Sequence, residues 1–313
     1  MENALFNLKS KKKLAKLLFY DKIGYLDKDL SFINNYSVFI VETSNGGTIK
    51  SRIVETPRGM LKVIHDRVFK FLNQVDLPDY LISKRGSSYV QNHISHKNNS
   101  NVVSIDIQKF YPMCSFGNVY KFFHNTMNMS PDVAYIISEI LTINYENIKI
   151  NDKVDEYLEQ QEVKNKVKFP TKHIPTGSSV SNILSFLSYR EMFEEIAQLS
   201  KRYNIEMTVY VDDITFSSNE QFPKTFIGKV KKILIKNGHK YNKRKSKKLD
   251  KNHNKNITGV IVNKYKQTKI PNKLHLKYKY AKRDLLKDPS QLNNQKLNGI
   301  KEAMKQIDTV SKK

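Results

Sequence analysis

An acidic turn between two short β-rich runs is the feature that most constrains the fold of this chain. Met207 to Val211 and Ile214 to Ser217 are separated only by Asp212-Asp213. So short a connection between two strand-like runs predicts a β-hairpin with both carboxylates at its tip. Any fold proposed for this chain must therefore include a hairpin with an acidic tip.

A second strand-like run carries a third carboxylate. Val102 to Ile107 reads Val-Val-Ser-Ile-Asp-Ile and places Asp106 at the end of a buried type of strand. If the two elements lie side by side, Asp106, Asp212 and Asp213 form one cluster, and their mutual repulsion favours bound cations. Carboxylate oxygens suit Mg²⁺, and two such ions stabilise in-line phosphoryl transfer. We therefore predict that these three aspartates bind metal and catalyse the reaction.

Each of these pieces has an ordinary explanation when it is taken alone. An Asp-Asp pair in a hairpin is most often a solvated turn, and a lone Asp in a strand is most often an edge or turn residue. The ordered combination of the two pieces along the chain is more specific than either piece.

The charge balance indicates the kind of partner. The chain has 54 Lys and Arg residues against 30 Asp and Glu residues, and the resulting charge of +24 is spread along its length. Such a surface suits a partner rich in phosphates. A basic protein that is merely soluble is the alternative, because charge bears on partners and not on fold or reaction.

Sequence patterns also bear on the compartment. Cys114 is the only cysteine and cannot form an internal disulfide, and the N-terminus has no leader-like pattern. No run of about 18 apolar residues predicts a membrane span. We expect a cytoplasmic protein without a membrane partner.

Other local patterns predict the surrounding elements. Two β-rich runs, Tyr36 to Thr43 and Thr48 to Glu55, flank Asn45-Gly46-Gly47 and predict a second hairpin. The segment from Asn151 to Lys168 is polar and predicts a solvent-facing insert. A single helix is predicted from Ser179 to Ile196, directly after the glycine turn Pro175-Thr176-Gly177.

The C-terminal part is predicted to be helical and basic. Lys273 to Lys287 holds six Lys or Arg residues, and Asp288-Pro289 is a helix-start signal. In the helix that follows, apolar residues recur at three- and four-residue steps and form one stripe. They are Leu297, Ile300, Met304 and Ile307.

The order of these motifs resembles that of reverse transcriptases over roughly residues 36 to 310. The matching segments are Ser104 to Pro112, Pro175 to Ser179, Tyr210-Val211-Asp212-Asp213, and Gly238 to Lys245. The resemblance implies an α/β (α+β) fold, a right-hand polymerase with fingers, an antiparallel palm sheet with helices, and a small helical thumb. It also implies fingers in residues 1–100, a palm in 101–264 with a finger insert at about 145–172, and a basic thumb in 265–313.

The same resemblance implies roles for further residues. The metal ligands would include Ile107 beside the three aspartates, and Tyr111 would lie beneath the incoming sugar, although core packing explains that ring nearly as well. Between Arg52 and Lys62 we favour Arg52 as the ligand of the triphosphate, because a guanidinium can fork onto phosphate oxygens. The other predicted nucleotide contacts are Thr176, Gly177 and Lys245, and any lysine of the run 243–248 could replace Lys245.

Two short motifs resemble those of bacterial retron enzymes. Asn92-His93-Ile94-Ser95-His96 resembles an Asn-Ala-x-x-His signature, with His93 in place of the usual alanine, and Ile257-Thr258-Gly259 resembles Val-Thr-Gly. A zinc site at the histidines is poorly supported, because no second ligand pair has suitable spacing. Thr176 stands where many relatives have Gln. The predicted nucleic-acid contacts are Asn92, His96, Asn182, Lys277, Lys282 and Arg283.

The retron resemblance implies an RNA-directed DNA polymerase in the bacterial cytoplasm. Such an enzyme binds its own noncoding RNA (msr-msd), starts from a guanosine 2′-OH, and uses dNTPs and two Mg²⁺ ions, or Mn²⁺, to make single-stranded DNA (msDNA). It serves phage defence, often with a separate effector protein. The alternatives are another defence-associated reverse transcriptase, with protein-primed or untemplated synthesis, and a non-catalytic nucleic-acid scaffold.

Overall fold

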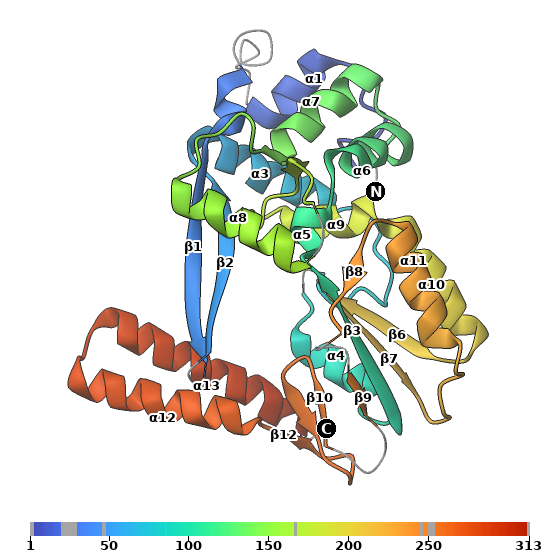
Figure 1. Cartoon of the computed structure of the whole chain (residues 1–313), viewed down its shortest axis with the longest axis vertical. Coiled ribbons are helices and arrows are strands. Elements are labelled where there is room, and N and C mark those ends of the chain that lie inside the picture. Colours follow the sequence, from blue (N-terminus) through green and yellow to red (C-terminus); the bar gives the residue numbers. More distant parts are fainter. Residues whose placement is uncertain are drawn as a thin grey trace. The chain divides into compact units, whose positions relative to one another are not determined.

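The chain divides into two compact units, each built from two separate stretches of sequence. The first unit comprises Met1–Asp76 and Lys109–Phe193, and the second comprises Leu77–Gln108 and Glu194–Lys313. Figure 1 shows the elements of the computed structural model. The structure describes residues 3–19, 30–45, 48–84, 86–165, 168–243, 247–249 and 254–311.

The long hairpin of the first unit forms as its two β-rich runs predict. Strand β1 (Tyr36–Asn45) pairs antiparallel with β2 (Thr48–Pro57), from Tyr36 opposite Pro57 to Asn45 opposite Thr48. The predicted turn residues Gly46 and Gly47 lie outside the described residues. Arg52 is exposed on β2, whereas Glu55 on the other face is buried.

Helices form the core of the first unit. Their buried side chains, such as Leu14, Leu61 and Ile137, recur at three- and four-residue steps and pack together. A short β4–β5 pair joins Ile143–Asn144 to Lys172–His173. The helical elements are α1 (Lys11–Phe19), η1 (Leu30–Asn34), α3 (Gly59–Leu72), α5 (Phe110–Met113), α6 (Phe116–Lys121), η2 (Phe122–Thr126), α7 (Pro131–Leu141) and α9 (Ser181–Ser188).

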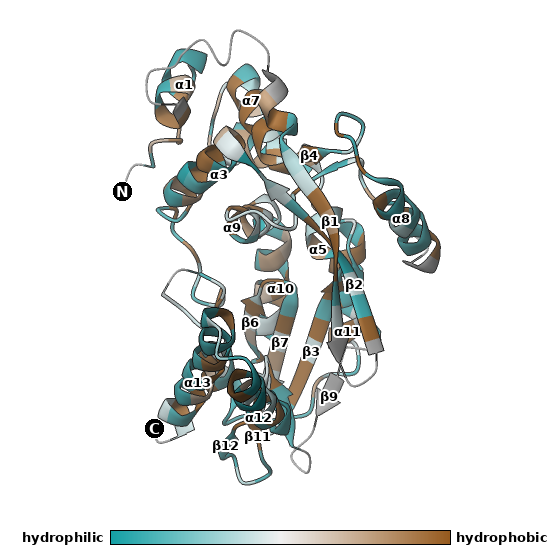
Figure 2. Ribbon diagram, turned by 90° about the vertical axis from the view of Figure 1, so that its left-hand side faces the viewer, coloured by the Kyte–Doolittle hydropathy of each residue, from teal (hydrophilic) through white to brown (hydrophobic). Residues whose placement is uncertain are grey.

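The polar insert predicted from Asn151 to Lys168 contains a helix. Helix α8 (Asp152–Asn165) is mostly hydrophilic, as its teal colour in Figure 2 shows, and it packs beside β1. Its contacts with the unit include the buried Val154 and the hydroxyl of Tyr157, which donates a hydrogen bond to the carbonyl of Ser51. Most of its other described side chains are exposed or half-buried, as expected for an insert.

The prediction of a single helix from Ser179 to Ile196 is wrong, because the helix is interrupted at Tyr189. Helix α9 ends at Ser188, and α10 runs over Arg190–Arg202. The buried hydroxyl of Tyr189 accepts hydrogen bonds from Asn118 Nδ2 at 2.8 Å and from the Ser115 amide at 3.3 Å, and donates to the carbonyl of Met113 at 3.1 Å. These tertiary contacts hold the residue outside helical geometry.

An antiparallel sheet forms the centre of the second unit. Its order is β6-β7-β3-β8, and β9 also pairs with β3. The brown stretch of β3 in Figure 2 marks the apolar part of this strand. The strands are β3 (Asn101–Gln108), β6 (Glu206–Tyr210), β7 (Asp213–Ser218), β8 (Lys240–Tyr241) and β9 (Lys247–Leu249).

Alternation of side chains gives this sheet one apolar and one polar face. Phe216 of β7 points to the apolar face and packs edge-on against Phe226 of helix α11 (Phe226–Lys236), with ring centroids 5.2 Å apart. Thr215 and Ser217 point to the opposite face. Helix α4 (Tyr89–His96) covers these hydroxyls. Asp106 of β3 and Asp213 of β7 also point to the polar face.

The C-terminal part of the second unit is a small sheet followed by two helices. Its core contains Val90, Val260 and Ile307. The last helix begins at Gln291, two residues after the Asp288-Pro289 signal. Leu297 and Ile307 of the predicted stripe are buried. The elements are β10 (Lys255–Ile257), β11 (Val260–Val262), β12 (Thr268–Lys269), α12 (Asn272–Lys287) and α13 (Gln291–Ser311).

The mixture of helices with antiparallel sheets confirms the predicted α+β class. Among the described residues, no helix is both long and apolar enough to cross a membrane.

Candidate active site

The structure brings two of the three predicted aspartates together across neighbouring strands. Asp106 of β3 lies directly opposite Asp213 of β7 in the antiparallel register. Residues paired in this way point to the same face of the sheet, with their Cβ atoms about 5 Å apart. Asp106 is buried, with 6% of its surface exposed, and Asp213 is half-buried. Two carboxylates therefore share one end of the polar face.

The turn that carries Asp212 is held in an unusual backbone conformation. Tyr210 pairs with Asp213, so Val211 and Asp212 form a two-residue loop. Such loops require a positive φ, and Val211 adopts φ +58°, which is rare for a β-branched residue. The Val211 amide donates to Ser83 Oγ at 3.3 Å. Strain of this kind persists where the surroundings enforce it, often at functional sites.

Backbone hydrogen bonds fix this turn beside Asp106. The Ile107 amide donates to the carbonyl of Asp212 at 2.7 Å, and the Asn242 amide donates to the carbonyl of Asp106 at 2.8 Å. Ile107, a predicted metal ligand, also pairs with Tyr241 of β8, and its side chain is buried. All three aspartates consequently belong to one rigidly connected end of the sheet.

The donor set suits a hard divalent cation. Within the described ranges, no three His, Cys, Asp or Glu side chains are already grouped tightly enough to hold a metal ion. Asp106 and Asp213 supply a facing pair of carboxylates, and Asp212 is the adjacent residue of the turn. Mg²⁺ is commonly bound through one or two carboxylates, with water and substrate phosphate completing its coordination. The residues present therefore fit such an ion.

The predicted nucleic-acid contacts Asn92 and His96 lie on the face of α4 that packs against the sheet, and both are completely buried. His96 Nδ1 lies 2.6 Å from Ser217 Oγ, and its Nε2 lies 2.7 Å from Thr208 Oγ1. Asn92 Nδ2 donates to Thr215 Oγ1 at 3.3 Å. Burial lowers the pKa of His96 to about 3. Because neither side chain is exposed, we revise their predicted role from direct contact to fastening α4 onto the sheet.

Further side-chain contacts join α4 to Thr258 and to strand β12. His93 Nε2 lies 2.8 Å from Thr268 Oγ1 of β12. Asn92 Nδ2 lies 3.5 Å from the hydroxyl of Thr258, which in turn donates to the carbonyl of Tyr89 at 2.9 Å. His93, which replaces the usual alanine, thus has a structural partner. Both retron-like motifs meet at this junction.

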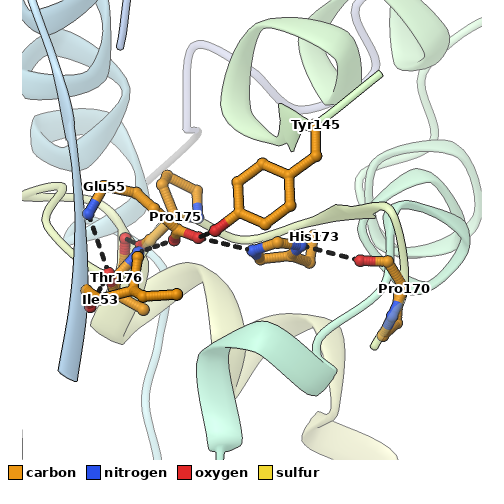
Figure 3. A network of polar contacts seen from close by, with 8 residues as sticks. Ile53, Glu55, Tyr145, Pro170, His173, Pro175 and Thr176 are labelled. Atoms are coloured by element: carbon orange, nitrogen blue, oxygen red, sulfur yellow. Dashed lines mark hydrogen bonds and ion pairs between the residues drawn. The ribbon is translucent and has the colours of Figure 1, made fainter. Parts of the chain in front are cut away.

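The predicted nucleotide contact Thr176 is engaged by strand β2. Its hydroxyl donates to the carbonyl of Ile53 and accepts from the amide of Glu55, both at 3.1 Å, and its own amide donates to Glu55 Oε2 at 2.8 Å (Figure 3). The Gly177 amide donates to the carbonyl of Glu55 at 3.0 Å. This turn therefore supports β2 directly.

The remaining predicted residues have varied surroundings. Tyr111 on α5 and Asn182 on α9 are half-buried, and the ring of Tyr111 lies 5.9 Å from that of Phe110. On α12, Lys277, Lys282 and Arg283 are exposed. Lys245 lies outside the described residues.

Sequence reasoning missed a buried polar network around Glu55. His173 Nε2 lies 2.9 Å from Glu55 Oε1, and the hydroxyl of Tyr145 donates to the same oxygen. These residues are 28 to 118 positions apart in the chain, and no local pattern links them. The only signal was an acidic residue directly after the apolar pair Ile53-Val54 at the end of a predicted strand.

Comparisons with known proteins agree with this geometry. The family model for reverse transcriptase (RNA-dependent DNA polymerase) matches residues 45–262. The chain is 28% identical over 219 residues to the retron Se72 reverse transcriptase of Salmonella heidelberg (strain 579083-10). That match covers 68% of this chain and 48% of the relative, so the chain spans about half the length of the curated relative.

Solved telomerase structures share the fold. Apo telomerase from Candida tropicalis matches with a TM-score of 0.53 and 11% identity, over 78% of this chain and 48% of that one. Telomerase from Candida albicans in complex with a TWJ fragment of telomeric RNA matches with a TM-score of 0.50 and 10% identity, over 96% of this chain and 59% of that one. The match of the family model over residues 45–262 establishes that the chain belongs to the reverse transcriptase family.

Proposed function

We propose that this chain is an RNA-directed DNA polymerase whose metal ligands are Asp106, Asp212, Asp213 and the carbonyl of Ile107. The observation that carries the proposal is the cross-strand pairing of Asp106 with Asp213 in a chain of the reverse transcriptase family. Functionally, residues 1–100 act as fingers, 101–264 as palm with a finger insert at about 145–172, and 265–313 as thumb.

The chain's own residues prepare the site for two divalent ions, Mg²⁺ or Mn²⁺. When bound, such ions stabilise the charge that develops on the attacking and leaving oxygens during phosphoryl transfer. Asp106 and Asp213 provide paired oxygen ligands, and the strained Val211 turn keeps Asp212 beside them. The Ile107 hydrogen bond to Asp212 limits the movement of this turn.

Residues of the first unit would bind the incoming dNTP. Arg52 is exposed, and its planar guanidinium suits two phosphate oxygens at once. Tyr111 would lie beneath the sugar, where a ribose 2′-OH would clash with its ring. Thr176 and Gly177 act by supporting β2. From the second unit, Lys245 is the proposed lysine near the leaving pyrophosphate.

The RNA partner would contact α12 and α9. Lys277, Lys282 and Arg283 give α12 an exposed basic surface, and Asn182 supports the nascent base pair. The similarity to the retron Se72 reverse transcriptase supports a retron function. The chain would bind a cognate msr-msd RNA, start from a guanosine 2′-OH, and make msDNA in a cytoplasmic anti-phage system with a separate effector.

A different defence-associated reverse transcriptase is the second candidate, since the family match alone fits it equally well. Sequencing the nucleic acid that copurifies with the protein separates the two candidates. One defined RNA with attached DNA supports the retron function. DNA that is heterogeneous or linked to protein supports protein-primed or untemplated synthesis.

Replacement of the turn aspartates tests the polymerase function itself. The double variant Asp212→Asn with Asp213→Asn should lose magnesium-dependent dNTP incorporation on an RNA template, because neutral amides remove the carboxylate charges that hold Mg²⁺. RNA binding, measured by filter retention, should stay near the wild-type level. Synthesis retained by this variant would refute the metal assignment. An inactive wild type that still binds RNA would support the non-catalytic scaffold.

A further inference from the structure

A fully buried carboxylate lies at the base of the β1–β2 hairpin. Glu55 is 1% exposed, and three donors from outside its own hairpin surround its carboxylate (Figure 3). His173 Nε2 lies 2.9 Å from Oε1, the Tyr145 hydroxyl donates to the same oxygen, and the Thr176 amide donates to Oε2 at 2.8 Å. All these groups belong to the first unit.

Hydrogen-bond chemistry assigns the charges of this network. His173 Nδ1 lies 2.9 Å from the carbonyl of Pro170, and a carbonyl only accepts. Nε2 faces the carboxylate of Glu55, which also only accepts when it is ionised. With Glu55 ionised, both ring nitrogens of His173 carry protons, and the ring is an imidazolium. Glu55 and His173 form a buried ion pair.

The electrostatics agree with this assignment. Burial alone would raise the pKa of Glu55, but attraction to His173 and the surrounding hydrogen bonds leave it lowered. Burial alone would lower the pKa of His173, but the carboxylate of Glu55 leaves it raised. Tyr36 of β1 also lies near enough for Glu55 to raise its phenol pKa, an effect that adds to burial. Both shifts favour the charged forms of the two side chains.

Further bonds join the adjacent turn to the same elements. Four consecutive turn residues bond to β2 or α3: Thr176 and Gly177 to Glu55, Ser178 to His65, and Ser179 to Asp66. The last two contacts are both 2.6 Å long. Because a buried ion pair is seldom more stabilising than apolar side chains of the same shape, its presence here favours a role in fixing geometry.

We infer that Glu55 and His173 are positioning residues for the incoming nucleotide: their buried ion pair fixes β2 on the Pro175–Ser179 turn and so sets the orientation of Arg52. Arg52 lies three residues before Glu55 on the same strand and projects from the opposite, exposed face. The inference rests on the proposed function, in which Arg52 binds the triphosphate.

Steady-state kinetics on an RNA template test this role. E55Q keeps the shape of the glutamate side chain, H173Q replaces the ring by a neutral side chain that can still donate a hydrogen bond, and each removes one charge of the pair. Each should raise KM for dNTP at least about fivefold with little change in kcat. E139Q is the matched control, because Glu139 is ion-paired with Lys172, the neighbour of His173 on β5. This control should keep the wild-type KM.

A second comparison asks whether the pair acts through the hairpin. In an R52A background the triphosphate ligand is already removed, so adding E55Q should raise KM no further. Equal increases in the wild-type and R52A backgrounds would show that Glu55 does not act through Arg52 and would overturn the inference.

A milder variant distinguishes a loss of positioning from a loss of folding. T176V keeps the ion pair but removes the hydroxyl that bonds to Ile53 and Glu55. It should raise KM in the same direction by a smaller factor, while thermal unfolding shows that the variant is still folded at the assay temperature. A wild-type KM in both T176V and H173Q would overturn the inference. If the wild-type protein makes no DNA on RNA, the proposed function fails instead.

Discussion

At the scale of single residues, Gly177 shows how closely the turn approaches β2. A Cβ built there would lie 2.8 Å from the carbonyl oxygen of Glu55, 2.8 Å from Thr56 Oγ1 and 3.0 Å from Val54 Cγ1. Two of these distances are shorter than real Cβ atoms tolerate, and the first is to backbone. The absence of a side chain at this position is therefore a packing requirement.

Gly177→Ala should destabilise the protein by about 1–3 kcal/mol, because the extra methyl group forces β2 and the turn apart. Urea unfolding measures the change in the free energy of unfolding. Gly228→Ala is the matched control, because that glycine lies in α11 with no atom within 4 Å of its added Cβ. The control should be stabilising by about 0.5–1 kcal/mol. Equal effects of the two changes would contradict this account.

Some residue roles were accessible from sequence and others were not. The three aspartates stand out because charged residues interrupt or end β-rich runs. The burial of Asn92 and His96 could not be predicted, since it depends on hydroxyls of Thr208, Thr215 and Ser217 more than 110 positions away. The ion pair of Glu55 with His173 escaped prediction for the same reason.

At the scale of elements, helix α12 presents a basic face with aromatic and apolar side chains beside it. Tyr280 is 50% exposed, and the guanidinium of Arg283 lies 5.2 Å from the centre of its ring. Leu276 and Leu286 are also exposed. Rings and guanidinium planes of this kind can stack on unpaired bases, while lysines bind phosphates.

Lys277→Ala combined with Lys282→Ala should weaken RNA binding and flatten its salt dependence. Removing one lysine–phosphate interaction lowers the slope of log K against log salt by about 0.7–0.9, so the double change should lower it by about 1.5. Binding titrations at several salt concentrations give the slope. Lys224→Ala, an exposed lysine outside α12, serves as the control. An unchanged slope in the double variant would exclude α12 from the RNA interface.

Elements were predictable where their signals are local. Both predicted hairpins form, because β-rich runs joined by short turns specify them without help from distant parts of the chain. The turn of the acidic hairpin lies one residue earlier than predicted, at Val211 and Asp212, so Asp213 belongs to the strand. The break at Tyr189 was missed, since it depends on partners at Met113, Ser115 and Asn118. The helix within the polar insert was also missed, because a polar composition indicates exposure rather than conformation.

At the scale of the whole molecule, buried histidines make stability depend on pH. Burial is the largest cause that lowers the pKa of His65 and His93 to about 4 and that of His96 to about 3, from an ordinary value of 6.5. These rings are neutral in the folded protein at neutral pH. Unfolding allows them to bind protons at a higher pH than the folded state does.

The free energy of unfolding should therefore fall as pH drops from about 6.5 toward about 4, because the unfolded chain binds more protons over this window. His173 acts in the opposite direction, since its raised pKa stabilises the fold below 6.5 and loses that contribution as pH rises through its folded value. Urea unfolding between pH 7 and pH 4.5 measures the balance. His96→Gln should show a shallower pH dependence than the wild type, and an equal slope would contradict this assignment.

Long-range contacts mark the limit of prediction for the whole chain. The order of motifs along the sequence was enough to indicate the family, which the match over residues 45–262 establishes. The cross-strand pairing of Asp106 with Asp213 brings together positions 107 residues apart, and no local pattern specifies such a pairing.

The register of β3 against β7 has a consequence for folding. Successive side chains alternate between the faces of a sheet, so a shift of β7 by one residue would move Asp213, Thr215 and Ser217 to the apolar side together. A shift that puts Ile214 opposite Asp106 would remove the facing carboxylate and place Phe216 where Thr215 bonds to Asn92. The opposite shift would place Phe216 where Ser217 bonds to His96. A misaligned chain could not close α4 over the sheet, so helix docking would select the strand alignment that also assembles the acidic end.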